Sequence, residues 1–126
     1  MPRVDLSSVN FDTGSAQITR GEVDKLSELA QSMGALISDD PSETFLIEGH
    51  TDAVGSDNSN LALSDRRAES VASALTEFYE IPAENLVTQG YGEQYLKVNT
   101  EGAERQNRRV TVRRITPLVQ PVGRSN

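Results

Sequence analysis

One acid and one arginine, 15 residues apart, are the side chains best placed for chemistry in this sequence. Asp52 lies in the polar segment His50–Asn60 (HTDAVGSDNSN), directly after a short apolar run, and Arg67 follows within a helical pattern. A carboxylate can hold an ammonium group, and a planar guanidinium can hold a carboxylate through two parallel hydrogen bonds. If both faced one cleft, they would match a zwitterion, and Asn60 could orient it with its amide donor and acceptor.

A purely structural role for the same two residues is the simpler interpretation. Acidic and basic side chains often pair, and an Asp52–Arg67 ion pair would tie the polar segment to the helix that follows it. Spacing alone favours this ion pair over a ligand site, because nothing in the composition demands a ligand.

A metal-assisted hydrolase is the alternative from another functional class. It would use His50, Asp52 and Glu48, but the chain has one His and no Cys, so carboxylates would have to supply most of the metal ligands. A lone His at a strand end more often makes an ordinary hydrogen bond. The sequence also lacks the G-x-S-x-G motif of a serine hydrolase. The residues therefore give the enzyme interpretations less support than a structural or a binding role.

Composition limits the class of protein and the kinds of partner. The 126 residues suit one domain, and 12 basic against 19 acidic side chains give a net charge of −7, which argues against nucleic-acid binding. Arg109, Arg113 and Arg114 are therefore expected to form a solvated strand face, whereas Arg108 is considered separately below. No stretch approaches the roughly 20 apolar residues of a membrane span, and the first residues lack a signal peptide. The chain is expected to be either cytosolic or a soluble piece of a longer exported protein.

Periodicity and turn residues predict the elements that must position these side chains. The helix at 20–38 follows a capping box at Thr19 and Glu22, and the second helix is expected to begin at Ser64, which would place Arg67 in its first turn. That helix should bury a face that includes Phe78 and Tyr79. The predicted order is a strand in 4–11, a helix, a strand at 44–48, an irregular segment at 49–59, the second helix, a strand at 86–90, a short helix in 101–106 and a strand at 108–115. This order predicts a two-layer α/β domain with its helices against one sheet.

A longer series of residues runs through nearly the whole chain. Its centre is Gly49-His50-Thr51-Asp52, Gly55, Asn60, Leu63-Ser64, Arg67-Ala68, Val71 and Leu75, and it is flanked by Phe11-Asp12, Gly90-Tyr91-Gly92-Glu93 and Asn107-Arg108-Arg109-Val110. Over residues 4–116 this pattern resembles the peptidoglycan-binding domain named after OmpA. The same family includes the peptidoglycan-associated lipoprotein and the flagellar stator protein MotB.

The resemblance implies a β-α-β-α-β-β fold with a mixed sheet of about four strands, in a binding domain over 1–116 with no enzymatic activity and no cofactor. Pro117 and Pro121 predict a loose tail over 117–126. It implies noncovalent binding of peptidoglycan peptide stems through diaminopimelate, whose free end carries an ammonium beside a carboxylate. Asp52 would hold the ammonium and Arg67 the carboxylate, while Asn60 and Arg108 would line the same cleft. Gly14 stands where some relatives have an Asn that touches the ligand.

The resemblance also implies a place in the cell. The domain would lie in the periplasm of a Gram-negative envelope, tethered to the outer or inner membrane through an anchor outside this sequence. The sequence is compatible with a homodimer, and a plain dimerisation domain with a vestigial cleft is a third interpretation.

Overall fold

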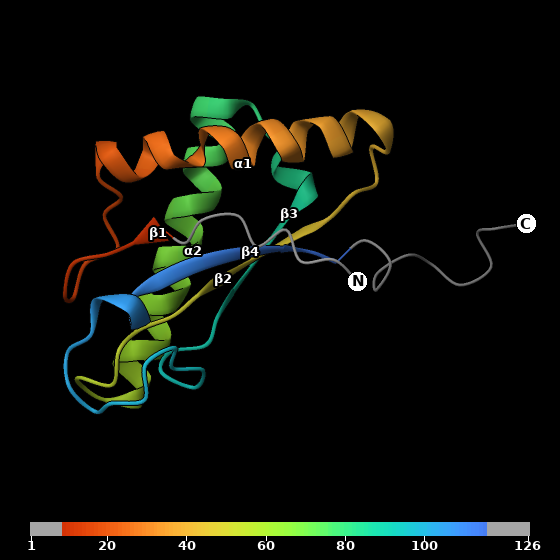
Figure 1. Ribbon diagram of the computed structural model, residues 1–126. Helices are drawn as coiled ribbons and strands as arrows, with labels where there is room; N and C mark the ends of the chain where they lie inside the picture. Colours follow the sequence, from red (N-terminus) through yellow and green to blue (C-terminus); the bar gives the residue numbers. More distant parts are fainter. Residues whose placement is uncertain (1–8, 116–126) are drawn as a thin grey trace, which may run out of the picture.

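The structure, a computed structural model, describes residues 9–115. The predicted first strand therefore falls partly inside this range, as β1 (Val9–Asn10), and the predicted tail over 117–126 lies outside it. Figure 1 shows the described chain as one unit in which helices pack against a sheet.

The four strands form one mixed sheet in the order β1-β4-β2-β3. At its centre β2 (Phe45–Gly49) pairs in parallel with β3 (Leu86–Gly90) and antiparallel with β4 (Arg109–Arg114), and β4 pairs antiparallel with β1. A parallel pair needs a crossover connection, and the helix between β2 and β3 provides it. The predicted β-α-β-α-β-β order and the mixed sheet are confirmed.

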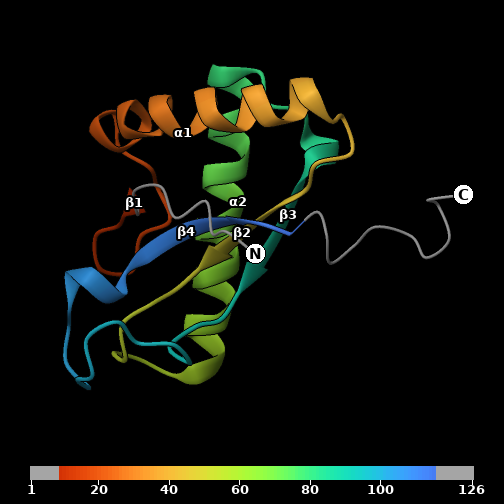
Figure 2. The ribbon, with the colours of Figure 1, turned by 45° about the vertical axis from the view of Figure 1, so that its right-hand side comes forward.

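The two helices, α1 (Arg20–Asp39) and α2 (Asp57–Tyr79), pack together against this sheet, with α1 lying crosswise to α2 in both ribbon views (Figures 1 and 2). Two short 3-10 helices, η1 (Ala83–Asn85) and η2 (Arg105–Asn107), precede β3 and β4. The second of these replaces the short helix expected in 101–106.

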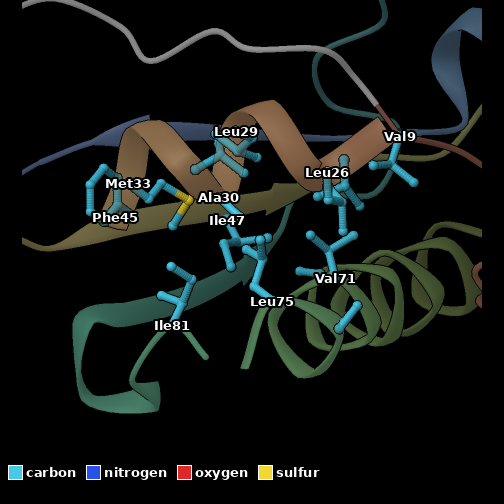
Figure 3. Packing of buried hydrophobic residues seen from close by; sticks show 14 of the residues in the cluster. Val9, Leu26, Leu29, Ala30, Met33, Phe45, Ile47, Val71, Leu75 and Ile81 are labelled. Atoms are coloured by element: carbon cyan, nitrogen blue, oxygen red, sulfur yellow. The ribbon is translucent and has the colours of Figure 1, made fainter. Parts of the chain in front are cut away.

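One hydrophobic core lies between the helices and the sheet (Figure 3). Alternate residues of β2 and β4 point into it, since side chains along a strand face opposite sides of the sheet. Their partners come from the apolar stripes of both helices. The fully buried members include Leu26, Met33, Phe45, Ile47, Val71 and Leu75. The predicted stripe of α1 is confirmed by this packing.

The start of α1 is also as predicted, with one difference in its capping box. Thr19 Oγ1 accepts a hydrogen bond from Glu22 N at 3.4 Å. The Glu22 carboxylate does not return this bond; it accepts one from Asn10 N at 2.8 Å and pairs with Lys25 at 2.8 Å. Glu22 therefore ties α1 to β1.

The predicted start of α2 at Ser64 is wrong. The helix begins at Asp57, and Ser56 is the N-cap, with its Oγ accepting a hydrogen bond from Ser59 N at 3.2 Å. Both Ser56-Asp57 and Ser64-Asp65 have capping chemistry, and the apolar stripe begins only after the second pair. Ser64 is instead buried inside the helix, where its hydroxyl donates to Leu61 O at 2.7 Å, a bond that Ser often makes in mid-helix.

The far end of α2 also differs from the prediction. Phe78 is 63% exposed, so it does not belong to the core face, whereas Tyr79 is partly buried and donates to Val23 O at 2.8 Å. The helix stops because Glu80 adopts a left-handed conformation, with φ of 60°.

An ion pair between the buried Glu43 and the partly exposed Arg114 closes the end of the sheet where β2 begins. Arg114 Nε donates to Glu43 Oε1 at 2.7 Å, and Glu43 is only 2% exposed. Asn85 Nδ2 donates to the carbonyls of Glu43 and Pro41 at 2.8 and 2.9 Å. These contacts join the beginning of β2 to the end of β4 and to η1.

Two glycines let α2 approach the opposite end of the sheet. A Cβ atom at Gly49 would overlap the backbone carbonyl of Ser64, and one at Gly90 would overlap the side chains of Ser64 and Asp65. The segment of α2 around Ser64 and Asp65 therefore rests directly on the carboxyl ends of β2 and β3.

We expect Gly49→Ala to lower the free energy of unfolding by about 3 kcal/mol, the upper range for overpacking, because the methyl group would meet rigid backbone. Urea denaturation measures this change. Gly34→Ala is the matched control: it lies inside α1 with no atom within 4 Å of a new Cβ, so it should stabilise by about 0.5–1 kcal/mol through helix propensity. Similar unfolding midpoints for the two variants would contradict the close approach.

Candidate ligand-binding site

The candidate site lies where the chain leaves β2 at its carboxyl end. Strand-like pairing continues past Gly49, since His50 N donates to Arg109 O and Thr51 N donates to Gly92 O, both at 2.8 Å. These two bonds fix the backbone immediately before Asp52. The position agrees with the rule that open α/β sheets bind ligands at the carboxyl ends of their strands.

Asp52 is buried, with 4% of its surface exposed. Its Oδ2 accepts hydrogen bonds from Arg108 Nη1 at 2.8 Å and from Glu104 N at 3.2 Å, and its Oδ1 accepts one from Val54 N at 3.2 Å. Burial acts to raise the pKa of Asp52, but the hydrogen bonds from Arg108 and the two backbone amides together bring it below its usual value. Asp52 is therefore a carboxylate at neutral pH.

Arg67 is completely buried. Its Nε donates to Ser15 O at 2.8 Å, its Nη1 to His50 O at 3.0 Å and its Nη2 to Asp12 O at 3.0 Å. The guanidinium also lies over the ring of Phe11, 5.1 Å from the ring centroid. Burial lowers the pKa of Arg67 to about 10, so the group remains protonated at neutral pH.

The helix start at Asp57 changes the position of Arg67 in α2. It lies ten residues into the helix (67 − 57 = 10), in the third turn and not in the first. Its side chain consequently reaches under the end of β2 toward the segment that precedes α1, and it does not project into an open cleft.

Arg108 and Asn60 complete the set of predicted residues. Arg108 is mostly buried, and besides pairing with Asp52 it donates from Nε to Phe11 O at 2.9 Å. Asn60 Nδ2 donates to Asp52 O at 3.4 Å and to Glu93 Oε1 at 3.0 Å. The structure thus brings all four residues to one place, from α2, the β2–α2 loop and the residue just before β4.

The ion pair of Asp52 is made with Arg108. Among residues 9–115, Asp52 and Arg67 do not form an ion pair within 4 Å, so the simple structural pair expected from spacing is wrong. Asp52 still acts on Arg67 through space, since its charge raises the pKa of Arg67 while the charge of Arg108 lowers it. The buried set contains two guanidinium groups and one carboxylate, so it carries a net charge of 2 − 1 = +1.

Sequence reasoning missed Asn107 as a residue that positions Arg108. Asn107 is completely buried; its Oδ1 accepts from Lys97 N at 2.7 Å and Val98 N at 2.8 Å, and its Nδ2 donates to Val98 O at 2.8 Å. These bonds hold the loop that enters β4. The sequence did contain one signal for Asn107, which is its position directly before Arg108 in the motif Asn107-Arg108-Arg109-Val110.

The geometry gives no support to the metal-assisted alternative. Glu48 pairs with Arg113 at 3.5 Å, and Asp52 pairs with Arg108. The ring of His50 stacks on Tyr91 with centroids 5.6 Å apart, and its Nδ1 is buried without a hydrogen-bond partner. Within the described range, no group of three or more His, Cys, Asp or Glu side chains is arranged to hold a metal ion.

Comparison with known proteins identifies the family to which this fold belongs. The OmpA family matches residues 10–110, a range that contains every element from β1 to the start of β4. This chain belongs to the OmpA family. The family is the peptidoglycan-binding, non-enzymatic type of domain that the sequence resembles.

Relatives within the OmpA family include longer proteins of the cell envelope. The chain is 34% identical to outer membrane porin F of Pseudomonas aeruginosa over 110 residues, which are 86% of this chain and 30% of porin F. It is 36% identical over 108 residues to the outer-membrane lipoprotein YfiB of the same species, covering 84% of this chain and 61% of YfiB. The chain therefore spans less than two thirds of the length of these relatives.

A solved OmpA-family structure has the same fold. The peptidoglycan-associated lipoprotein of Burkholderia pseudomallei matches with a TM-score of 0.72 and 28% identity, covering 85% of this chain and 88% of that one. No helix within residues 9–115 has the length and apolar character needed to cross a membrane.

We expect Arg67→Lys to lower the free energy of unfolding by about 3 kcal/mol. The planar guanidinium binds three carbonyls on different sides, and the compact ammonium of lysine cannot replace all of these contacts. Each of two lost hydrogen bonds from a charged donor costs about 1.5 kcal/mol. Urea denaturation provides the measurement. Arg66→Lys changes the exposed neighbour in the same way and should alter stability by about 0.5 kcal/mol or less. Equal effects of both substitutions would contradict the structural role of Arg67.

We also expect His50 to make the domain less stable as the pH falls from about 6.5 to 4. Burial, aided by the charge of Arg109, lowers the pKa of His50 from 6.5 to about 4, so the unfolded chain takes up a proton first and acid favours unfolding. The full difference is at most about 3 kcal/mol.

Asp52 also makes the domain less stable in acid, but at lower pH. Its folded pKa lies below the ordinary 3.8, and its stabilising contribution is lost only as the pH falls through that folded value.

Denaturation of the parent and of His50→Gln at pH 7, 6, 5 and 4.5 measures the effect of His50. A pH slope that is unchanged in the variant would show that His50 is not the group responsible.

Proposed function

We propose that this OmpA-family domain binds peptidoglycan noncovalently by holding the diaminopimelate of a peptide stem, and so tethers a parent envelope protein to the cell wall. The observation that carries the proposal is the buried excess of positive charge formed by Arg67, Arg108 and Asp52. A buried charge is costly unless it is paired. The ammonium and carboxylate of a diaminopimelate head provide one partner for each sign of charge.

Asp52 is the group proposed to hold the ammonium. It is ionised at neutral pH, and in the described structure its Oδ1 accepts one hydrogen bond, from Val54 N. A carboxylate oxygen can accept further bonds, so an ammonium could bind without displacing Arg108. Val54 and Gly55 beside it are exposed, which leaves this side of the loop accessible to a ligand.

Arg67 is the group proposed to hold the carboxylate. Three of its five N–H groups donate to carbonyls of residues 9–115, and the repulsion from Arg108 makes an added negative charge favourable there. Its Nε and Nη2 donate to the carbonyls of Ser15 and Asp12, in the exposed turn around Gly14. A carboxylate that bound Arg67 by this edge would take the place of those two carbonyls, so we propose that this turn moves on binding. Gly14, with φ of 68°, gives the turn its left-handed residue.

The relatives support the proposed place in the cell. Porin F and the lipoprotein YfiB are outer membrane proteins by name, and the chain covers only part of each. We therefore propose that the domain lies in the periplasm, attached to the outer or inner membrane through another part of its parent protein.

The ligand provides the first test. We expect a tripeptide stem ending in diaminopimelate to bind at least 30-fold more tightly than the same stem with lysine, because lysine lacks the side-chain carboxylate assigned to Arg67. This follows from the cost of about 2–5 kcal/mol for leaving one member of a charged contact unpaired. Isothermal titration calorimetry measures both affinities. Equal affinities would remove the role given to Arg67, and absence of binding to either stem would overturn the proposed function.

A pair of variants tests the acid in the same experiment. Asp52→Asn keeps the size of the side chain but removes the charge, so it should weaken binding of the diaminopimelate stem by a similar factor. Asp57→Asn is the matched control, since Asp57 is an exposed acid five residues away at the start of α2. Circular dichroism of both variants shows whether they are folded. Equal binding by Asp52→Asn and the parent would contradict the assignment.

A further inference from the structure

We propose that Tyr91 and Tyr95 form a stacking platform for a sugar ring of the glycan strand, beside the site for the peptide stem. The ligand class is an N-acetylated hexopyranose, the sugar that carries the stem in peptidoglycan. This inference rests on the proposed function, because it assigns a second contact to the same polymer.

Three rings form a continuous cluster from the interior to the surface. His50 is 4% exposed and stacks on Tyr91, with centroids 5.6 Å apart and an interplanar angle of 21°. Tyr91 in turn meets Tyr95 edge to face at 5.2 Å and 75°. Tyr95 is 59% exposed. A buried ring therefore supports a half-buried ring, which supports an exposed one.

Backbone hydrogen bonds fix the turn that carries the two tyrosines. Tyr91 N donates to Gly49 O at 3.0 Å, and Gly92 N donates to the hydroxyl of Ser64 at 2.9 Å. At the exposed end, Arg109 Nη2 donates to Tyr95 O at 3.1 Å. A rigid aromatic surface costs little conformational entropy when a ligand stacks on it, so the platform is preorganised.

The same turn borders the stem site. Gly92 O accepts from Thr51 N at 2.8 Å, directly before Asp52, and the Glu93 carboxylate accepts from Asn60 Nδ2 at 3.0 Å. A stem held at Asp52 is covalently joined to its sugar through a few residues. The sugar is therefore confined near the stem site, where Tyr95 offers an exposed ring.

Polar groups next to the rings suit the hydroxyl and amide groups of such a sugar. Glu48 lies on the same face of the sheet as His50, because side chains two residues apart along an extended chain share a face. Glu48 pairs with Arg113 at 3.5 Å and also interacts with the hydroxyl of Tyr91. Carboxylate and guanidinium groups beside an aromatic ring can bind the polar edge of a pyranose while its apolar face stacks.

Two soluble ligands test the platform: the diaminopimelate tripeptide alone, and the same tripeptide joined to N-acetylglucosaminyl-N-acetylmuramic acid. We expect the parent domain to bind the disaccharide-tripeptide about 5- to 10-fold more tightly than the free tripeptide. Tyr95→Ala should abolish this difference without changing the affinity for the free tripeptide. Tyr95→Phe should preserve it, because the ring is retained.

Phe78→Ala is the matched control, because Phe78 is an exposed ring at the far end of α2 and its loss should leave both affinities unchanged. Equal affinities of the parent for the two ligands, or an equal loss for both ligands in Tyr95→Ala, would overturn the platform. If the parent fails to bind the free tripeptide, the proposed function is wrong, and chemical-shift changes of the Tyr91 and Gln94 amides on addition of tri-N-acetylglucosamine then test the platform alone. Shifts that vanish in Tyr95→Ala would support it, and absence of shifts in the parent would overturn it.

Discussion

The hydrogen bonds from one buried guanidinium to three backbone carbonyls organise this domain. Arg67 projects from α2 and joins the segment before α1, through Asp12 and Ser15, to the end of β2, through His50. The segment before α1, the end of β2 and the middle of α2 are far apart in sequence. Within the described fold, the Arg67 side chain joins all three through its hydrogen bonds. The guanidinium that binds these carbonyls is also the group proposed to pair with the carboxylate of the ligand. Fold and site therefore depend on the same group, which explains why Arg67 is buried instead of displayed at the surface.

Close packing of α2 on the sheet places the rest of the site. The absence of side chains at Gly49 and Gly90 lets the segment of α2 around Ser64 and Asp65 lie directly on the ends of β2 and β3. Asn60 is thereby held against both Asp52 and the turn after β3. From the other side, Asn107 fixes the loop that brings Arg108 to Asp52. The acid is thus enclosed by groups from its own β2–α2 loop, from α2 and from the segment between β3 and β4.

Much of the fold could be predicted from local patterns. The stripe of α1, its cap at Thr19 and the three longer strands follow from periodicity and turn residues, which act over a few positions. The start of α2 could not be chosen locally, because Ser56 and Ser64 have equal capping chemistry. The earlier turns are held by contacts that are distant in sequence, such as that of Asn60 with Glu93. The partner of Asp52 was equally inaccessible, since Arg108 lies 56 residues away and spacing contains no information on such contacts. The longer motif identified the members of the site without showing which of them pair.

The Glu43–Arg114 pair has a mechanical consequence for a domain that holds on to a polymer. It fastens the last residue of β4, while the residue just before this strand, Arg108, is fastened to Asp52. If the site and the far end of the sheet were pulled apart, the force would consequently run along β4. The backbone hydrogen bonds between β4 and β2 would then be loaded in shear. Such a ladder must break many bonds together, whereas one pulled from an edge opens bond by bond, so this strand is well suited to carry force.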